Sequence, residues 1–339
     1  MKKSVFIGSL VATAIVSSLL TYLFTQEFSP KPVAYKDKKA MKAVTTPNCP
    51  IELVRIPNSS SELIGPLLFA DVTCSSPELD SLKRKVSDVI NDRKKSGAID
   101  QASVYVKSLR SGLWFEVNGT QQYEPGSMMK IAILMTYLKK SEQDPAFFKR
   151  ELKLTSSFGQ NTGLNQIRTS APLELNKNYS VERLIEEMIV NSDNDATQLL
   201  IDNIDKELFS RVMGDISGRT PDISDPNYAL SVMEYNRYLR VLYNTSYLNR
   251  EKSLYALELL SRTNFKGGLT KALPAGVSVA HKFGERPSDN GFNFHEGGIV
   301  YLKGNPYAIV VMTKGKNSML LPEVIADVSK ICYDGLSAM

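Results

Sequence analysis

Five short strand-like runs, divided into two groups by a long helical stretch, constrain the fold of this 339-residue chain more than any other feature. In the first group, residues 102–109 and 112–119 meet at Arg110-Ser111-Gly112, which is typical of a hairpin connection. The second group comprises residues 276–285, 292–304 and 306–315. The simplest arrangement of these runs is a single antiparallel sheet.

Helical periodicity surrounds and separates the strand-like runs. Residues 77–97 carry apolar side chains at helical spacing, residues 125–140 form a turn that leads into an apolar helix, and residues 321–336 close the chain with a helix. Residues 141–270 are helical with loops. This order predicts an α+β fold, with a five-stranded antiparallel sheet flanked by helices and an all-helical insertion beside it.

The N-terminus predicts a membrane segment. After Lys2 and Lys3, residues 4–26 carry no charge, and a helix of that length can span about 30 Å of hydrocarbon. We expect residues 1–26 to be an uncleaved signal-anchor or a cleaved signal peptide, with a buried helix as the remaining alternative. Lysines at positions 31–42 oppose export by simple charge counting, but a short basic start is typical of exported chains. The prediction is an extracytoplasmic protein, anchored through this helix or secreted if the segment is cleaved.

Residues 27–75 are predicted to form a tether and a collar before the main domain, which spans residues 76–339. Residues 27–48 are rich in Lys and Pro, as a tether is, and residues 49–75 hold apolar stretches that fit an edge strand or a small ordered collar. Cys49 and Cys74 could pair if this region is exported. Cys332 is expected to be a buried apolar residue on the last helix.

The charge balance excludes one class of function. Lys and Arg number 41 and Asp and Glu 36, and no Lys/Arg run reaches the density of a surface that follows phosphates. We therefore expect no nucleic-acid partner. We expect no metal site, because the sequence shows no cluster of metal-binding residues and the two histidines fit packing or a supporting hydrogen bond. We also expect no other cofactor and a monomeric protein.

A serine and a lysine share one face at the start of the helix predicted over residues 125–140. Ser127 follows Pro125-Gly126, and Lys130 lies three residues on, within possible hydrogen-bond reach. A serine hydroxyl needs a neighbouring base to act as a nucleophile. A lysine can serve as that base if burial or nearby positive charge lowers its pKa. Taken alone, the pair favours the alternative of a capping serine and a surface lysine.

The tripeptide Ser-Asp-Asn occurs twice, and the two copies are interpreted differently. Ser192-Asp193-Asn194 lies between two predicted helices, where a short loop can direct a hydroxyl and an amide into a cleft. Ser288-Asp289-Asn290 precedes Gly291 between two predicted strands, where it fits a hairpin turn. Lys282-Phe283-Gly284 lies in the strand before that turn, and its glycine permits close approach of a ligand.

The order of Ser-x-x-Lys, Ser-Asp-Asn and Lys-x-Gly along residues 77–335 resembles that of the penicillin-recognising serine enzymes. Within that superfamily the chain looks most like the class A β-lactamase branch. The stretches that carry this resemblance are residues 125–130, 189–202 and 297–315. The resemblance implies that Ser127 is the acylated nucleophile and Lys130 its proton acceptor.

The resemblance also implies roles for the other motif residues. Ser192, helped by Lys282, would relay a proton to the leaving nitrogen, and Asn194 would hold a side-chain amide of the substrate. The backbone N–H groups of Ser127 and Glu285 would form the oxyanion hole. Only the backbone of Glu285 is needed, and its side chain with that of Arg286 fits a solvated pair.

Two positions depart from the family pattern. The family usually has Ser or Thr at the position of Phe283, where the hydroxyl binds the substrate carboxylate. A phenyl ring cannot donate that hydrogen bond. Recognition of the carboxylate must therefore be weak or come from another residue, with Arg286 as a candidate. Class A enzymes activate the deacylating water with a glutamate in a loop that matches residues 213–233, which contain no Glu. The available carboxylates are those of Asp215, Asp222 and Asp225. Their alternative role is loop structure, such as a pair with Arg219, and Glu234 is expected to face solvent.

These observations predict a β-lactamase-like serine hydrolase of the bacterial cell envelope. It would form an acyl-enzyme with β-lactams or related peptidoglycan amides, with slow deacylation because the loop glutamate is absent. One alternative is a penicillin-binding D-Ala-D-Ala carboxypeptidase or transpeptidase. The other is a catalytically inactive cell-wall binding protein that kept the fold.

Overall fold

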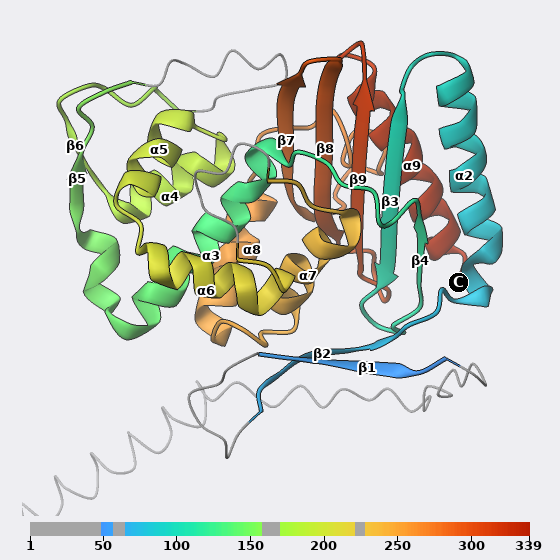
Figure 1. The fold of residues 1–339 in the computed structure, drawn as a ribbon, viewed down its shortest axis with the longest axis horizontal. Coiled ribbons are helices and arrows are strands. Elements are labelled where there is room, and N and C mark those ends of the chain that lie inside the picture. The colour runs from blue at the N-terminus through green and yellow to red at the C-terminus, as the bar shows by residue number, and fades with distance from the viewer. Residues whose placement is uncertain (1–48, 57–64, 158–169, 221–227) are drawn as a thin grey trace, which may run out of the picture. The chain divides into compact units, whose positions relative to one another are not determined.

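A five-stranded antiparallel sheet forms the centre of the main domain (Figure 1). The computed structural model describes residues 49–56, 65–157, 170–220 and 228–339. The strand order is β4 (Trp114–Val117), β3 (Gln101–Ser108), β9 (Tyr307–Gly315), β8 (Gly291–Val300) and β7 (Val279–Ser288). The predicted strands are therefore confirmed, and Asp289-Asn290 forms the turn between β7 and β8.

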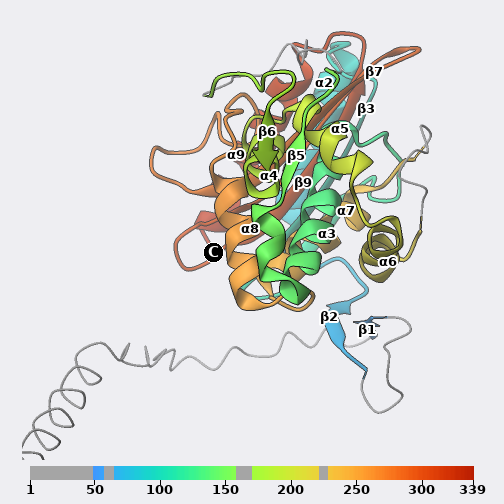
Figure 2. The ribbon, with the colours of Figure 1, turned by 90° about the vertical axis from the view of Figure 1, so that its left-hand side faces the viewer.

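Helices cover both faces of the sheet (Figures 1 and 2). One face packs against α2 (Asp80–Lys95) and α9 (Leu321–Ser337). The helical insertion covers the other face and contains α3 (Lys130–Gln143), α4 (Val181–Val190), α5 (Asn194–Asp202), α6 (Lys206–Ser217), α7 (Val232–Tyr243) and α8 (Arg250–Ser261). The small strands β5 (Glu151–Lys153) and β6 (Asn178–Ser180) pair at its edge.

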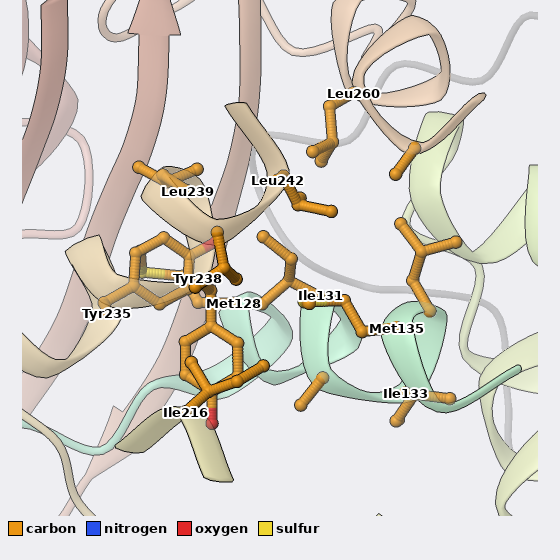
Figure 3. Close-up of a cluster of buried hydrophobic side chains, with 14 of the residues drawn as sticks. Met128, Ile131, Ile133, Met135, Ile216, Tyr235, Tyr238, Leu239, Leu242 and Leu260 are labelled. Atoms are coloured by element: carbon orange, nitrogen blue, oxygen red, sulfur yellow. The ribbon is translucent and has the colours of Figure 1, made fainter. Parts of the chain in front are cut away.

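Alternation along the strands separates the two cores. In β9, Ile309 and Val311 face the core under α2 and α9, whereas Val310 and Met312 face the helical insertion. This is the two-residue period of a strand that is buried on both faces. Figure 3 shows the core on the insertion side, where Ile131 and Met135 of α3 meet Leu242 of α7 and Leu260 of α8.

Side-chain caps fix where the helices of the insertion begin. Ser180, Asp193, Asp205 and Ser231 each accept a hydrogen bond from a backbone N–H in the first turn of α4, α5, α6 and α7, respectively. At the other end of α6, Gly218 adopts φ of 77° and terminates the helix. These local interactions set the ends of the helices that carry the candidate site.

A disulfide-linked hairpin forms the predicted collar. Strands β1 (Ile51–Arg55) and β2 (Leu67–Val72) pair antiparallel, and a disulfide joins Cys49 to Cys74. In β2, Asp71 accepts hydrogen bonds from Lys107 of β3 at 3.0 Å and Arg240 of α7 at 2.5 Å. The collar is thus fixed to the main domain by ionic contacts, and Cys332 is a buried free thiol as predicted.

The structure corrects one expectation from the sequence, and another concerns residues that it does not describe. The expectation of a loop over residues 213–233 is partly wrong, because helix α6 continues through residue 217. The predicted membrane segment and tether, residues 1–48, lie outside the described residues. Within the described part of the chain, no helix has the length and apolar character needed to cross a membrane.

Candidate active site

The turn before α3 places Ser127 beside β7. Residues Gly126–Met129 form a 3-10 turn, and the α-helix begins at Lys130. The side chain of Met128 is buried in the core and anchors this turn (Figure 3). A Cβ atom on Gly284 would collide with the carbonyl oxygen of Pro125 and lie 2.8 Å from the backbone nitrogen of Met128. Glycine at this position is what lets the turn lie directly against the strand.

Lys130 is fully buried and points towards the loop between α4 and α5. Its Nζ donates to the carbonyl oxygen of Ser192 at 2.6 Å, to Ser192 Oγ at 3.2 Å and to Asn194 Oδ1 at 3.0 Å. Burial lowers the pKa of Lys130 to about 7, against the opposing field of Asp193. A lysine in this state can accept a proton near neutral pH.

The hydroxyl of Ser192 accepts hydrogen bonds from two lysines, Lys130 and Lys282. Lys282 of β7 donates to Ser192 Oγ at 2.9 Å and to the carbonyl oxygen of Phe283 at 3.1 Å. Burial lowers the pKa of Lys282 well below its usual value; the positive charge of Lys130 lowers it further, and Glu296 opposes both effects. Ser192 itself adopts φ of 53°, an uncommon conformation for a residue other than glycine.

The expected Ser127–Lys130 contact differs in detail from the sequence prediction. The two residues are neighbours at the helix start, but the hydrogen bonds of the Lys130 ammonium go to Ser192 and Asn194. Sequence spacing fixes the shared face of a helix, whereas the choice of partner depends on the Ser192 loop, which is distant in sequence. Hydrogen bonds join Lys130, Ser192, Asn194 and Lys282, and Ser127 lies in the turn that leads into Lys130.

Phe283 belongs to an aromatic cluster. Its ring centroid lies 4.6 Å from that of Phe265 and 6.0 Å from that of Phe294, and the side chain is 3% exposed. The Lys282 ammonium lies 4.2 Å from the centroid of the Phe283 ring. Phe283 is therefore a buried packing residue that contacts the cation of the site through its ring face.

The two residues after Gly284 lie at the edge of the site. A Cβ atom on Gly126 would lie 2.8 Å from the carbonyl oxygen of Glu285, so the backbones of the turn and the strand are in close contact here. Arg286 Nε lies 2.9 Å from Glu124 Oε2, and both side chains are more than a third exposed. The candidate carboxylate receptor thus already has an acidic neighbour.

Of the carboxylates considered for deacylation, only that of Asp215 lies within the described residues. Asp215 lies on α6 and accepts a hydrogen bond from Tyr247 at 2.9 Å, while Asp222 and Asp225 lie outside the described residues. The expectation that Glu234 faces solvent is wrong. Its side chain caps α7 by accepting from Ser231 and pairs with Arg219 at 2.8 Å.

Both histidines have the supporting roles expected of them, but the sequence did not predict the partner of His281. His295 Nε2 donates to the carbonyl oxygen of Glu124, and burial lowers the pKa of His295 to about 4. His281 Nδ1 lies 2.5 Å from Glu296 Oε1. Glu296 could have been noticed as the one acidic residue of strand β8. Among the described residues, no group of His, Cys, Asp or Glu could hold a metal ion.

Comparison with known proteins finds solved structures with the same fold. No protein of curated function matches the chain. An acyl-enzyme complex of a PBP-A mutant with penicillin G is 21% identical in sequence, with a TM-score of 0.65, over 78% of this chain and 100% of that chain. The TLA-1 extended-spectrum β-lactamase is 20% identical, with a TM-score of 0.65, over 77% and 99% of the two chains. A β-lactamase from Chitinophaga pinensis is 18% identical, with a TM-score of 0.64, over 75% and 98%.

These similarities establish a shared fold. Membership of a protein family is shown by a match to a family sequence model. The model described as "Beta-lactamase enzyme family" matches residues 81–336, which span the sheet, the helical insertion and the residues around Ser192. This chain therefore belongs to the beta-lactamase enzyme family.

Proposed function

We propose that this protein is a serine acyl-transfer enzyme that opens β-lactams or related peptidoglycan amides through an acyl-enzyme on Ser127. The observation that carries the proposal is the convergence of Lys130 and Lys282 on Ser192 Oγ, at 3.2 and 2.9 Å, beside the turn that holds Ser127. Two buried amines and two hydroxyls are the groups that proton transfer in serine catalysis needs.

The first step is attack by Ser127. Neutral Lys130 accepts the hydroxyl proton as Ser127 Oγ bonds to the carbonyl carbon, and the backbone N–H groups of Ser127 and Glu285 stabilise the oxyanion. The carbon–nitrogen bond of the amide then breaks. Ser192 gives its proton to the leaving nitrogen and regains one from the lysines, with which it shares hydrogen bonds.

Deacylation is proposed to be slow. The sequence has no Glu between Glu207 and Glu234, and the carboxylates of Asp215 and Glu234 are held by Tyr247 and Arg219. A water molecule that attacks the acyl-enzyme would therefore lack the base that class A enzymes are expected to use. This supports a second candidate function, a penicillin-binding D-Ala-D-Ala carboxypeptidase or transpeptidase whose natural acyl group leaves readily.

Turnover of two substrates separates the candidates. The full chain is incubated with benzylpenicillin and, separately, with a peptide that ends in D-Ala-D-Ala, and both products are quantified. We expect sub-stoichiometric penicillin hydrolysis and release of D-Ala, each abolished by Ser127→Ala. Rapid penicillin turnover would instead make the protein a β-lactamase, and no reaction with either substrate would favour a non-catalytic cell-wall binding protein. Membrane attachment through residues 1–26 stays a prediction.

A further inference from the structure

A buried carboxylate lies beside the loop that carries Ser192. Glu187, in the last turn of α4, has a fully buried side chain. Arg183 and Ser170 donate to one of its oxygens, Ser170 at 2.8 Å, and Asn191 Nδ2 donates to the other at 2.7 Å. A carboxylate accepts hydrogen bonds through both oxygens, so Glu187 matches all three donors. These hydrogen bonds offset the cost of burying its charge.

Asn191 links this carboxylate to the residue that follows it, Ser192. The Nδ2 of Asn191 also donates to Ser170 Oγ at 2.8 Å, and its Oδ1 accepts from Asn264 Nδ2 at 2.6 Å. These contacts fix the orientation of the amide, because a flipped amide would place its oxygen against the carboxylate of Glu187. The Asn191 side chain is therefore held from two directions.

The backbone of Ser192 needs such support. Its φ of 53° is uncommon for a residue other than glycine, and a conformation of this kind persists only where the surrounding structure enforces it. The backbone N–H groups of Asn191 and Asp193, on either side of Ser192, donate to the carbonyl oxygen of Glu187 at 3.2 and 3.0 Å. Glu187 thus holds the loop through its backbone directly and through its side chain by way of Asn191.

The same hydrogen bonds extend towards β7. Asn264 is bonded to the Ser192 loop through the amide contact with Asn191. Its neighbour Thr263 donates from Oγ1 to the carbonyl oxygen of His281 at 2.8 Å, and Lys282 follows His281 in β7. One short segment is therefore bonded to the loop that carries Ser192 and to the strand that supplies one of its lysines.

We infer that Glu187 is a positioning residue that, through Asn191, holds Ser192 in the conformation in which its hydroxyl meets Lys130 and Lys282. The inference deepens the proposed function and rests on it for its catalytic meaning, since Ser192 can give its proton to the leaving nitrogen only if its hydroxyl is correctly placed. Without the carboxylate of Glu187, Asn191 Nδ2 loses this acceptor. The loop can then relax towards ordinary backbone angles and withdraw the hydroxyl from the lysines.

Glu187→Met tests this role, because it keeps an unbranched side chain suited to a helix and removes both acceptor oxygens. Single-turnover acylation of the full chain is timed with benzylpenicillin and with the thioester of phenylacetylglycine and thioglycolate. The nitrogen that leaves from penicillin must take up a proton, whereas a thiolate leaves as an anion. We expect the ratio of the two rate constants, penicillin over thioester, to fall at least about 10-fold. A general loss of folded protein lowers both rates equally and leaves this ratio unchanged.

Glu186→Met is the matched control. Glu186 precedes Glu187 on α4 and also pairs with Arg183, at 3.3 Å, but its side chain is 33% exposed. This variant should keep the ratio of the natural chain. Asn191→Ala removes the same link from its other end and should lower the ratio, so it tests the inference even if Glu187→Met fails to fold. An unchanged ratio in either folded variant, or an equal fall in Glu186→Met, would overturn the inference.

The two proposals fail separately, because the conformation of Ser192 can be followed without any substrate. At positive φ the N–H and Hα protons of one residue lie close together, so Ser192 should give a strong NOE between them. It is measured in the full chain labelled with [15N]serine and assigned by Ser192→Ala. We expect this NOE to weaken in Glu187→Met and to persist in Glu186→Met.

If the natural chain is acylated by neither substrate, the proposed function fails, while the NOE still decides whether Glu187 holds Ser192. An NOE of unchanged strength in folded Glu187→Met overturns the inference, whatever the protein does with penicillin.

Discussion

At the scale of single residues, the burial of Lys130 predicts a pH dependence. Because the pKa of Lys130 is lowered to about 7, the fraction of neutral lysine rises about tenfold per pH unit below that value and levels off above it. The acylation rate should follow this curve. Lys130→Arg should lower the rate at least about 100-fold, since a guanidinium stays protonated.

A matched substitution on the same helix controls for a general effect of arginine. Lys139 of α3 donates to the carbonyl oxygen of Tyr247 and pairs with Glu142, away from Ser192. Lys139→Arg should leave the acylation rate and its pH profile unchanged. Stopped-flow measurement with a chromogenic penicillin gives both rates, and a profile without an inflection near neutral pH would exclude Lys130 as the base.

Gly284 predicts a packing effect at the site. In Gly284→Ala the new methyl group would meet the backbone of Pro125 and lie 2.8 Å from the nitrogen of Met128, and neither backbone atom can move cheaply. We expect a loss of about 1–3 kcal/mol in the free energy of unfolding, together with slower acylation. Gly65→Ala is the control, because its Cβ would lie at an ordinary 3.6 Å from the Arg55 side chain. Equal stability of the two variants in urea titrations would contradict this account.

Motif order in the sequence was enough to select Lys130, Ser192 and Lys282, which hydrogen bonds join in the structure. Their detailed contacts were not accessible, because the Lys130 ammonium is directed by the Ser192 loop, 62 positions away. The packing of Phe283 against Phe265 and Phe294 and the pairing of His281 with Glu296 likewise depend on strand register. Register decides which side chains face each other across the sheet, and single residues do not reveal it.

At the scale of secondary structure, strands were easier to predict than the ends of helices. Alternating apolar residues and hairpin turns identified every strand of the central sheet. Helix α6 was partly taken for a loop, because residues 213–233 were matched to a loop of the class A family pattern. The apolar residues Leu208, Val212 and Ile216 recur at helical spacing and are buried, and Gly218 only ends the helix. Tertiary burial outweighed local propensity here.

The collar hairpin predicts a large effect of one carboxylate. Asp71 is bonded to Lys107 and Arg240, whose side chains are 8% and 4% exposed. Burial raises the pKa of Asp71, but Arg240 and Lys107 outweigh this effect and hold it below the usual value. Asp71→Asn would leave two buried cations unpaired and should lower the free energy of unfolding by about 3–5 kcal/mol.

An exposed ion pair offers the control for this effect. Asp327 of α9 pairs with Arg93 of α2, and both side chains are more than a third exposed. Asp327→Asn should therefore cost about 0.2–1 kcal/mol. Denaturant titrations near neutral pH compare the two variants, and similar losses would mean that Asp71 does not hold the collar in place.

At the scale of the whole molecule, two different sets of helices cover the two faces of the central sheet. One face packs against α2 and α9, and the other packs against the helical insertion (Figures 1 and 2). The buried lysines that contact Ser192 come from α3 and β7. Composition and element order were sufficient to predict this α+β architecture. The attachment of the collar was not predictable, since it depends on Asp71 meeting Lys107 and Arg240 from distant parts of the chain.

The most direct test of the central claim is intact-mass spectrometry of the full chain over time after addition of benzylpenicillin. We predict a single adduct of one penicillin per chain, mapped by digestion to Ser127, which persists after free drug is removed and is absent in Ser127→Ala. An adduct that survives in Ser127→Ala, or no adduct at any drug concentration, would contradict the claim that Ser127 is the acylated nucleophile.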